Sequence, residues 1–304
     1  MSKTLTIRYT SDTHGYLYPT SYADMQDRPM GLMKLASEYP HDGNTLIIDG
    51  GDTIQGSPLT NLYQRLSPEE KAACLTEDTY GTHPIAAMMN LAGYQFVTLG
   101  NHDFNYGVDA LLDYLTNLDA LCLCANIRDK EGRLPIAPYA VHQLENGLRV
   151  GLVGVCTHFV RRWENPKTVE QLVIEEPVPA AKAALEAVKP LCDLTVLIYH
   201  GGFECDLETG KPLTASAENQ ACRMCRELDF DLVLTGHQHM RVDGVHFGNS
   251  FAVQPAYRAP HCCGVTVTVE DDGSKRFESR IIPADGRPLE SAYNLLMPLE
   301  KRVQ

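Results

Sequence analysis

The sequence predicts an α/β protein in which layers of helix cover a central sheet. Short apolar runs, each ending abruptly at a glycine or a polar cluster, indicate buried strands. Stretches of helical character lie between these runs over most of the chain, and this alternation is typical of α/β folds. With 304 residues, of which 44% are hydrophobic, the chain can fill the core of one large domain or two small ones.

Six apolar runs have the length of buried strands and stop where a strand would end. They span residues 5–9, 45–48, 96–99, 148–155, 194–199 and 231–234. Five stretches between them are predicted to be helices, at residues 31–38, 84–92, 108–118, 179–189 and 217–228.

A hairpin is predicted near the C-terminus, where the charged segment 270–275 separates a strand at 265–269 from another at 276–282. Residues 289–304 are interpreted as a terminal helix or as the start of a linker to a further domain. The polar segment 66–83 is interpreted as an insertion or a long surface loop.

The net charge of the chain limits the classes of ligand that it can bind. A formal net charge of -13 repels polyanions, which argues against a protein that holds a nucleic-acid polymer by its phosphates. Small anionic substrates stay possible if cations neutralise the site locally. The first residues show no secretory signal, and no run approaches the roughly 18 apolar residues of a membrane span. We therefore expect a cytoplasmic protein without membrane contact.

The ten cysteines are predicted to be reduced thiols, because a chain of this size has a core of its own and their spacing shows no disulfide framework. Cys222 and Cys225 form a C-x-x-C inside a predicted helix. Since no second pair accompanies it, we interpret it as structural rather than as a redox or zinc site.

Side chains that can bind metals follow five of the predicted strands. The carboxyl ends of strands in an open α/β sheet form the crevice where ligands bind, so these loops can converge on one site. Pooled, they offer seven oxygen and nitrogen donors: Asp12, His14, Asp52, Asn101, His200, His237 and His239. Five other histidines lie outside these loops and are interpreted as core or surface residues: His41, His83, His142, His246 and His261.

Seven donors are too many for one ion with open positions, and they suit two ions roughly 3.5 to 4 Å apart that share a carboxylate and a hydroxide. Such a set fits Mn²⁺, Fe, Zn²⁺ or Co²⁺, with Mn²⁺ as our default, and the absence of cysteine disfavours a closed structural zinc site. Neighbouring glycines let the backbone turn sharply and let ligands crowd together: Gly50, Gly51, Gly100, Gly201 and Gly236.

Taken together, these motif blocks resemble the calcineurin-like metallophosphoesterase superfamily in order and approximate spacing. Further similarity at residues 31–34 and 218–219 narrows the resemblance to the branch of 5'-nucleotidases and 2',3'-cyclic-nucleotide phosphodiesterases. It covers about residues 4–285 and implies a four-layered α/β/β/α sandwich. We therefore expect residues 1–285 to form the metallophosphoesterase domain and 286–304 a C-terminal tail or the start of a linker helix.

The resemblance also implies roles for individual residues. Asp12, His14 and His239 would hold the first metal, whereas Asn101, His200 and His237 would hold the second. Asp52 would bridge the two metals. A metal-bound hydroxide would attack phosphorus in line, and His102 would stabilise the transition state and protonate the leaving oxygen.

One position departs from the branch, which usually carries an aspartate three residues after the catalytic histidine. Here that residue is Asn105, which can orient an imidazole through a hydrogen bond but cannot stabilise its cation by charge. Either Asp103 or another carboxylate substitutes, or the acid step is weaker. Asp103 itself is interpreted as a support for the site.

The sequence says less about the substrate. Relatives of this branch bind the nucleotide with a separate C-terminal domain, and that half is absent from this sequence. Arg161 and Arg162 are hypothetical phosphate contacts, and the adjacent Trp163 and Glu164 resemble a tryptophan–acid pair of the cyclic phosphodiesterases.

We expect a phosphodiesterase or phosphomonoesterase acting on a nucleotide or another small phosphate ester. The same chemistry on a nucleotide-sugar or another non-nucleotide ester is one alternative. A non-catalytic, metal-dependent binding module is the other.

Overall fold

The computed structural model describes residues 2–74 and 83–303. Within it, the alternation of apolar residues along the strands determines the layers of the molecule. In β1 (Lys3–Thr10) the side chains of Leu5, Ile7 and Tyr9 point into one core, and the residues between them face away. In β12 (Leu194–His200), Val196 and Ile198 enter the same core, whereas Leu197 and Tyr199 enter another. Strands buried on both faces need a layer on each side.

Two large sheets pack face to face across the core that these strands share. The seven-stranded sheet has the order β17 (Lys275–Pro283), β16 (His261–Val269), β1, β4 (Thr45–Asp49), β5 (Phe96–Val97), β6 (Leu121–Leu123) and β8 (Ile136–Ala137). The six-stranded sheet has the order β14 (Arg241–Phe247), β15 (Ser250–Pro255), β13 (Leu232–Thr235), β12, β10 (Arg149–Cys156) and β9 (Tyr139–Gln143).

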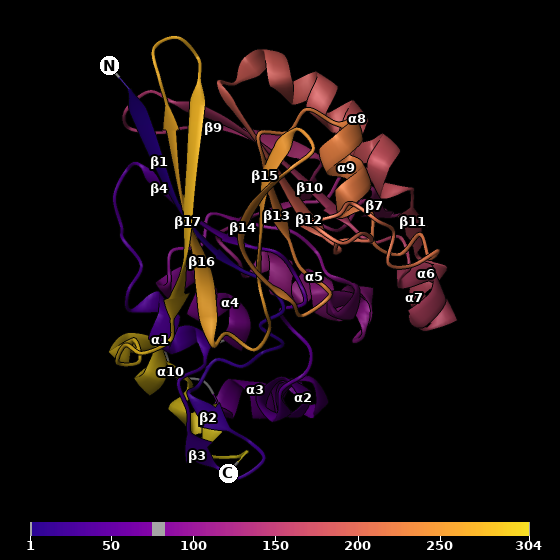
Figure 1. Ribbon diagram of the computed structural model, residues 1–304. Helices are drawn as coiled ribbons and strands as arrows, with labels where there is room; N and C mark the ends of the chain where they lie inside the picture. The colour runs from indigo at the N-terminus through magenta and orange to yellow at the C-terminus, as the bar shows by residue number, and fades with distance from the viewer. Residues whose placement is uncertain (1, 75–82, 304) are drawn as a thin grey trace.

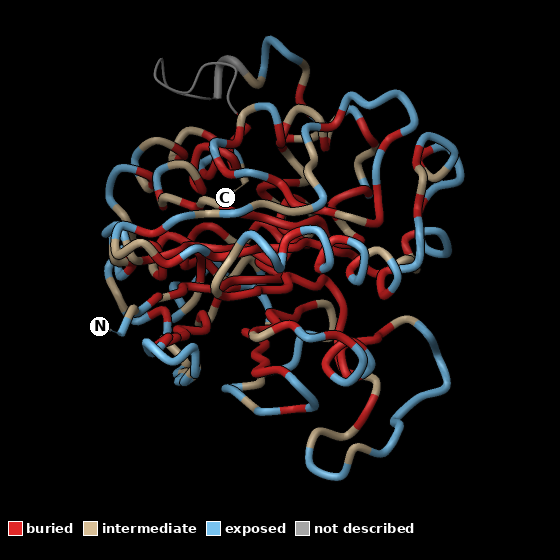
Figure 2. The backbone as a smooth tube through the Cα atoms, turned by 90° about the horizontal axis from the view of Figure 1, so that it is seen from above, coloured by how far each residue is buried: buried red, intermediate tan, exposed pale blue. Residues whose placement is uncertain are grey.

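Helices cover the outer faces of both sheets (Figure 1). The first sheet packs against α1 (Leu32–Ala36), α2 (Pro58–Arg65), α4 (Pro84–Leu91), α5 (Val108–Thr116) and α10 (Glu290–Glu300). The second sheet packs against α8 (Pro177–Val188) and α9 (Ala221–Glu227). The result is the expected four-layered α/β/β/α sandwich, and Figure 2 shows buried strands through its middle and exposed loops around them.

The remaining elements are short. The α3 helix (Pro68–Cys74) contacts α10, and two-residue strands β2 (Thr20–Ser21) and β3 (Gln26–Asp27) pair with each other. Another small pair joins β7 (Ile127–Asp129) to β11 (Leu172–Ile174). The connections also contain α6 (Val160–Trp163), α7 (Pro166–Val169) and the 3-10 helices η2 (Asn101–Phe104) and η3 (Lys189–Leu191). Among the described residues, no helix combines the length and apolar character that crossing a membrane requires.

All eight predicted strands and all five predicted helices are found, with ends that differ by a few residues. The expected loop at 66–83 is wrong in part, because α3 occupies Pro68–Cys74; residues 75–82 lie outside the described residues. The C-terminal segment is a helix that buries Ala292, Leu296 and Leu299 in the core beside the first sheet. The boundary at residue 285 stays a prediction.

The expectation of reduced cysteines is wrong for one pair. Cys205 and Cys222 form a disulfide that ties the loop after β12 to the first turn of α9. The pairing joins Cys222 to a residue outside its C-x-x-C, and Cys225 stays a free, buried thiol. Spacing could not reveal this bridge, because it depends on how the loop folds back over the helix.

Candidate functional site

The predicted donor residues meet at one edge of the sandwich, where parallel strands of both sheets end. The first sheet brings Asp12 and His14 after β1, Asp52 after β4, and Asn101 in η2. The second sheet brings the other three donors, namely His200 at the end of β12 and His237 and His239 after β13. Because the two sheets pack together, loops more than two hundred residues apart share this edge.

One group of donors consists of Asp12, His14 and His239, whose potential ligand atoms all lie within 4.8 Å of one another. The Nε2 atoms of His14 and His239 are 3.1 Å apart, and Nε2 of His239 is 3.5 Å from Oδ1 of Asp12. Two imidazole nitrogens facing each other at this distance need a proton or a cation between them. We call this set the outer group.

A second group consists of Asp52, His200 and His237, again with ligand atoms within 4.8 Å of one another. Nε2 of His200 is 3.2 Å from Oδ2 of Asp52, and the same oxygen is 3.9 Å from Nε2 of His14. Asp52 therefore lies between the two sets. We call the second set the inner group.

Hydrogen bonds to backbone carbonyl oxygens orient two of the histidines. Nδ1 of His14 lies 2.9 Å from the carbonyl oxygen of Gln55, and Nδ1 of His200 lies 2.6 Å from that of Gly50. A carbonyl accepts only, so each Nδ1 carries the proton, and each Nε2 presents its lone pair to the site.

Two acceptor atoms in the site are buried without a hydrogen-bond partner. They are Oδ1 of Asn101 and Nε2 of His200. Buried polar atoms nearly always have a hydrogen-bond partner or a bound ion, so we expect a donor or a cation to bind at these two atoms. Together with the nitrogen pair of the outer group, they make the donor set fit divalent cations of the kind that bind oxygen and imidazole.

The backbone around the site is strained in a regular way. Five of the seven donors have positive φ angles, from 50° to 71°: Asp12, His14, Asp52, His237 and His239. This left-handed conformation is uncommon for residues other than glycine and gathers at functional sites. A Cβ atom on Gly100 would stand 2.1 Å from Oδ1 of Asp52, so that position must be glycine for the two loops to approach.

Burial and charge interactions both shift the pKa values of the donors strongly. Burial raises the pKa of Asp12 to about 7, and the neighbouring charge of Asp52 acts in the same direction. Burial alone would lower the pKa of His200, but the carboxylate of Asp52 raises it to about 10. Without a cation, Nε2 of His200 therefore holds a proton against Oδ2 of Asp52, and a cation bound at this lone pair would displace that proton. The same pairing holds the pKa of Asp52 well below its usual value despite burial. Burial lowers the pKa of His239 to about 4, which keeps its ring neutral and able to bind a cation.

Asp103 supports the loop that carries Asp52. Its carboxylate accepts four backbone N–H groups, from Asp52, Thr53, Ile54 and Gly100, at 2.8 to 3.0 Å. These bonds join the ends of β4 and β5. Burial raises the pKa of Asp103, and the charge of Asp52 adds to this effect. Asp103 therefore holds donors in place and does not face the site itself.

A chain of side chains leads away from His102. Its backbone N–H donates to Oδ1 of Asp52 at 2.7 Å, and its ring Nδ1 lies 2.8 Å from Oδ1 of Asn105. The amide nitrogen of Asn105 in turn donates to Oε1 of Glu164. A carboxylate thus stands one amide away from the imidazole. Burial raises the pKa of Glu164, and its bond from Asn105 counteracts that rise.

A hollow of about 410 Å³ opens beside the inner group. Trp163, 47% exposed, lies on its wall with its ring stacked at 5.4 Å on the ring of His237. Oε1 of Glu218 lies 2.7 Å from Nε2 of His237, which leaves Nδ1 of that ring for a cation. The residues around the hollow are Asn101, His102, Asn105, Trp163, Glu164, Glu218, His237 and Gln238.

Arg161 and Arg162 are not brought to this hollow. Both are exposed on α6, and the guanidinium of Arg162 lies over the ring of Phe159, 4.7 Å from its centre. The residues of this segment that do reach the hollow are Trp163 and Glu164, at the end of α6.

Residues 5–241 match the model of the calcineurin-like phosphoesterases. The chain belongs to this family. The match spans all seven donor positions, so the geometry of the strand ends and the family assignment agree.

Relatives of this chain are named as phosphoesterases of nucleotides. The chain is 28% identical over 250 residues to the trifunctional nucleotide phosphoesterase protein YfkN of Bacillus subtilis (strain 168), covering 77% of this chain and 16% of that protein. It is 25% identical over 316 residues to the 2',3'-cyclic-nucleotide 2'-phosphodiesterase/3'-nucleotidase of Salmonella typhimurium (strain LT2), covering 95% of this chain and 46% of that protein. The chain thus spans less than half the length of either relative.

A crystal structure of calcineurin-like phosphoesterase YfkN from Bacillus subtilis shows the same fold. The TM-score is 0.81 at 23% identity, with 100% of this chain and 98% of that chain covered. The chain accordingly has the family and the fold of the calcineurin-like phosphoesterases, and its relatives include proteins named as nucleotidases and cyclic-nucleotide phosphodiesterases.

Two acidic residues at the site were not among the predicted site residues. Glu218 approaches His237 from the loop before α9, and Glu164 completes the chain from His102 through Asn105. The departure at Asn105 was the available signal for the second, because it called for a substitute carboxylate. The resemblance had marked Glu164 as part of a tryptophan–acid pair, but no spacing in the sequence could link it to Asn105.

Proposed function

We propose that this phosphoesterase binds two divalent cations and hydrolyses a phosphate ester of a nucleotide or a similar small molecule. The observation that carries the proposal is the pair of three-residue donor groups with Asp52 between them and buried, unpartnered acceptors facing inward. The relatives named as nucleotidases and cyclic phosphodiesterases support a nucleotide as substrate.

The two groups divide the cation-binding work. Asp12, His14 and His239 would hold one cation, and Asn101, His200 and His237 the other, with Asp52 as a ligand to both. Two divalent cations, when bound, would supply the nucleophilic water and neutralise the phosphoryl oxygens. Mn²⁺ is our proposed metal, and Zn²⁺, Fe and Co²⁺ suit the same donors.

His102 is the proposed proton donor to the leaving oxygen. Its ring borders the hollow but is not a member of either donor group, so it is free to contact the substrate. The proton on its Nδ1 is fixed by Oδ1 of Asn105, which leaves Nε2 to exchange a proton at the leaving oxygen. Glu164 supplies, through Asn105, the negative charge that an asparagine lacks.

The hollow beside the inner group is the proposed substrate site. Trp163 offers an exposed aromatic surface next to the donors, which suits the flat base of a nucleotide. The longer relatives make a further C-terminal domain a reasonable partner in binding the rest of the substrate. The cytoplasmic location stays a prediction, and the Cys205–Cys222 disulfide is a bond that oxidising compartments preserve.

An assay of the metal-stripped protein, reloaded with Mn²⁺, tests the proposal. The substrates are 2',3'-cyclic AMP, 3'-AMP and 5'-AMP, and the control is Asp52→Asn. We expect turnover that returns with the metal and is absent from the control, because the variant removes the charge that both cations share. The ratio of diester to monoester turnover then distinguishes phosphodiesterase from nucleotidase.

Two results would contradict the proposal. Failure to bind any divalent cation would overturn the metal mechanism itself. Two bound cations without turnover of any phosphate ester would favour the non-catalytic binding module, and turnover confined to nucleotide-sugars or other esters would move the substrate class away from simple nucleotides.

A further inference from the structure

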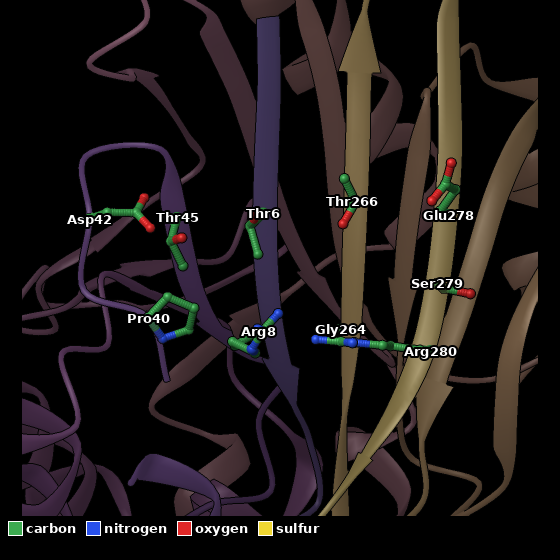
Figure 3. A pocket seen from close by; sticks show the side chains of 10 residues that line it. All are labelled: Thr6, Arg8, Pro40, Asp42, Thr45, Gly264, Thr266, Glu278, Ser279 and Arg280. Carbon is green, nitrogen blue, oxygen red and sulfur yellow. The ribbon is translucent and has the colours of Figure 1, made fainter. Parts of the chain in front are cut away.

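Two arginines share one row on the outer face of the first sheet, away from the metal donors. The strand register pairs Arg8 of β1 with Gly264 of β16, and Gly264 with Arg280 of β17. Directly paired residues point to the same side of a sheet, so the two arginines flank a position without a side chain. Figure 3 shows both guanidinium groups reaching toward each other over Gly264.

Glycine at position 264 leaves the space that the arginines use. A Cβ atom there would stand 3.2 Å from Nη1 of Arg8 and 2.6 Å from Cδ1 of Ile282. The row beside it consists of small polar residues and one acid, in the order Thr45, Thr6, Thr266 and Glu278. The two rows and the loop at residues 40–42 enclose a hollow of about 390 Å³.

Arg8 is buried without the partner that a guanidinium needs. It is 8% exposed, and within the part of the chain that the structure describes its Nε has no hydrogen-bond partner. The one hydrogen bond of its side chain there is a long contact of 3.4 Å from Nη1 to the carbonyl oxygen of Ile7. Burial and the like charge of Arg280 both lower the pKa of Arg8. A buried charge is normally paired, and within the described residues no ion pair joins Arg8 to an acid, although the charge of Asp42 acts to raise its pKa.

The acids at the rim do not fill this role. Oδ1 of Asp42 accepts the backbone N–H of Asn44 at 2.8 Å, and Glu278 forms its ion pair with Arg276 at 3.4 Å. Within the described residues, neither acid comes within ion-pair distance of Arg8 or Arg280. The guanidinium groups of Arg8 and Arg280 therefore face one hollow, in which threonine hydroxyls are further hydrogen-bond donors.

We propose that the hollow between Arg8 and Arg280 binds a small tetrahedral oxyanion of the phosphate class, at a site separate from the metal donors. Guanidinium groups recognise such anions with paired N–H donors, and the threonine hydroxyls of the neighbouring row can donate to the remaining oxygens. The anion would neutralise the buried charge of Arg8. The free ion and the phosphate group of a small monoester share this chemistry.

The test is calorimetric titration of the metal-loaded protein with inorganic phosphate at constant ionic strength. Phosphate also binds metal centres, so the decisive background is Asp52→Asn, which weakens that competing site. Arg280 is exposed, and Arg280→Gln should fold normally. Arg149→Gln removes the same charge from an arginine paired with Asp193 elsewhere on the surface and serves as the matched control.

We expect the Asp52→Asn protein to retain one phosphate site, which Arg280→Gln weakens about tenfold or more and Arg149→Gln leaves unchanged. Arg8→Gln should have the same effect as Arg280→Gln. Repeating the titration with glycerol 3-phosphate shows whether the free ion or a monoester binds more tightly. Absence of a phosphate site in Asp52→Asn, or a site indifferent to Arg280→Gln, would overturn the proposal.

Discussion

The outer and inner donor groups contain the same residue types but lie in different surroundings. In the inner group the side chains of Asp52 and His200 are 1% and 0% exposed, and they form a close pair. In the outer group the side chain of His239 is 39% exposed and stacks at 4.4 Å on the ring of Tyr257, itself at the surface. Protein atoms thus enclose Asp52 and His200, whereas water reaches the outer group through His239, since Asp12 and His14 are themselves buried.

This difference suggests how the two halves of the site divide their tasks. A buried, preorganised set loses little on binding its cation and should release it slowly. The hollow also lies beside the inner group, through Asn101 and His237. We therefore expect the inner group to position the substrate and the outer group to exchange its cation more readily.

Removing one histidine from each group tests most directly whether the two groups differ in their tasks. We expect His200→Ala to lower kcat/KM by roughly three orders of magnitude, about 4 kcal/mol, because it removes a ligand and leaves Asp52 buried without its partner. His239→Ala should cost roughly one to two orders of magnitude, since water can replace an exposed ligand. Metal content per chain, measured after dialysis, and kcat/KM would be compared for both variants.

Equal losses in the two variants would contradict the division of tasks. A larger loss in His239→Ala would reverse it. Denaturant unfolding of the metal-free proteins measures how each substitution affects folding apart from metal binding. We expect His200→Ala to unfold at a lower denaturant concentration than wild type, and His239→Ala to unfold at the same concentration.

The donors of both groups could be predicted from the sequence because each follows a strand, and parallel strands place their ends at one edge. The two groups themselves could not be separated by the strand pattern. Which histidine meets which aspartate depends on how the two sheets are offset, and the resemblance to the family was needed to propose it. The structure brings Asp12, His14 and His239 together without reference to that resemblance.

The fold was predictable where strands are long and apolar, as in β1, β10 and β12. It was not predictable in β14 (Arg241–Phe247) or β9 (Tyr139–Gln143), which lie at the edges of the second sheet and carry many exposed residues. Edge strands have only one neighbour and need fewer apolar side chains, so their pattern is weak. The disulfide and the Glu164 contact depend on tertiary approach and left no pattern either.

A second test concerns the hollow beside the inner group, where Glu164 contacts His102 through Asn105. We expect Glu164→Gln to lower kcat on nucleoside monophosphates by about 10- to 100-fold, because the imidazole then lacks the charge that supports its protonated form. Turnover of 4-nitrophenyl phosphate should change little, since its leaving group departs without a proton. Rates on both substrates would be measured with Mn²⁺-loaded protein.

The matched control is Glu170→Gln, an exposed acid of the same segment that makes no side-chain contact with the hollow. An equal loss on both substrates would mean that Glu164 maintains the shape of the site rather than the proton transfer. A change in KM alone would assign it to substrate binding.

The smallest expected effect concerns the pKa of a buried histidine with a carboxylate beside it and of one without. His200 and His83 are 0% and 1% exposed, yet the carboxylate of Asp52 raises the pKa of His200 to about 10, whereas burial lowers that of His83 to about 3. His83 lies in the core beside α4, with Tyr63 and Tyr114 against its ring. Below pH 6.5 the unfolded chain binds a proton at His83 that the folded chain excludes. Stability from this residue is thus present above pH 6.5 and is lost as the pH falls toward 3.

We expect His83 to cost the wild-type protein about 2 kcal/mol of unfolding free energy between pH 8 and pH 5. Urea unfolding of the metal-free protein would measure this loss. The comparison is His83→Asn, which keeps an acceptor for the N–H of Ile85 at the start of α4 but has no proton to bind. The variant should be less stable at pH 8 and should lose less on acidification. Parallel pH profiles for the two proteins would mean that His83 binds its proton equally well in the core, and that a carboxylate is not what separates it from His200.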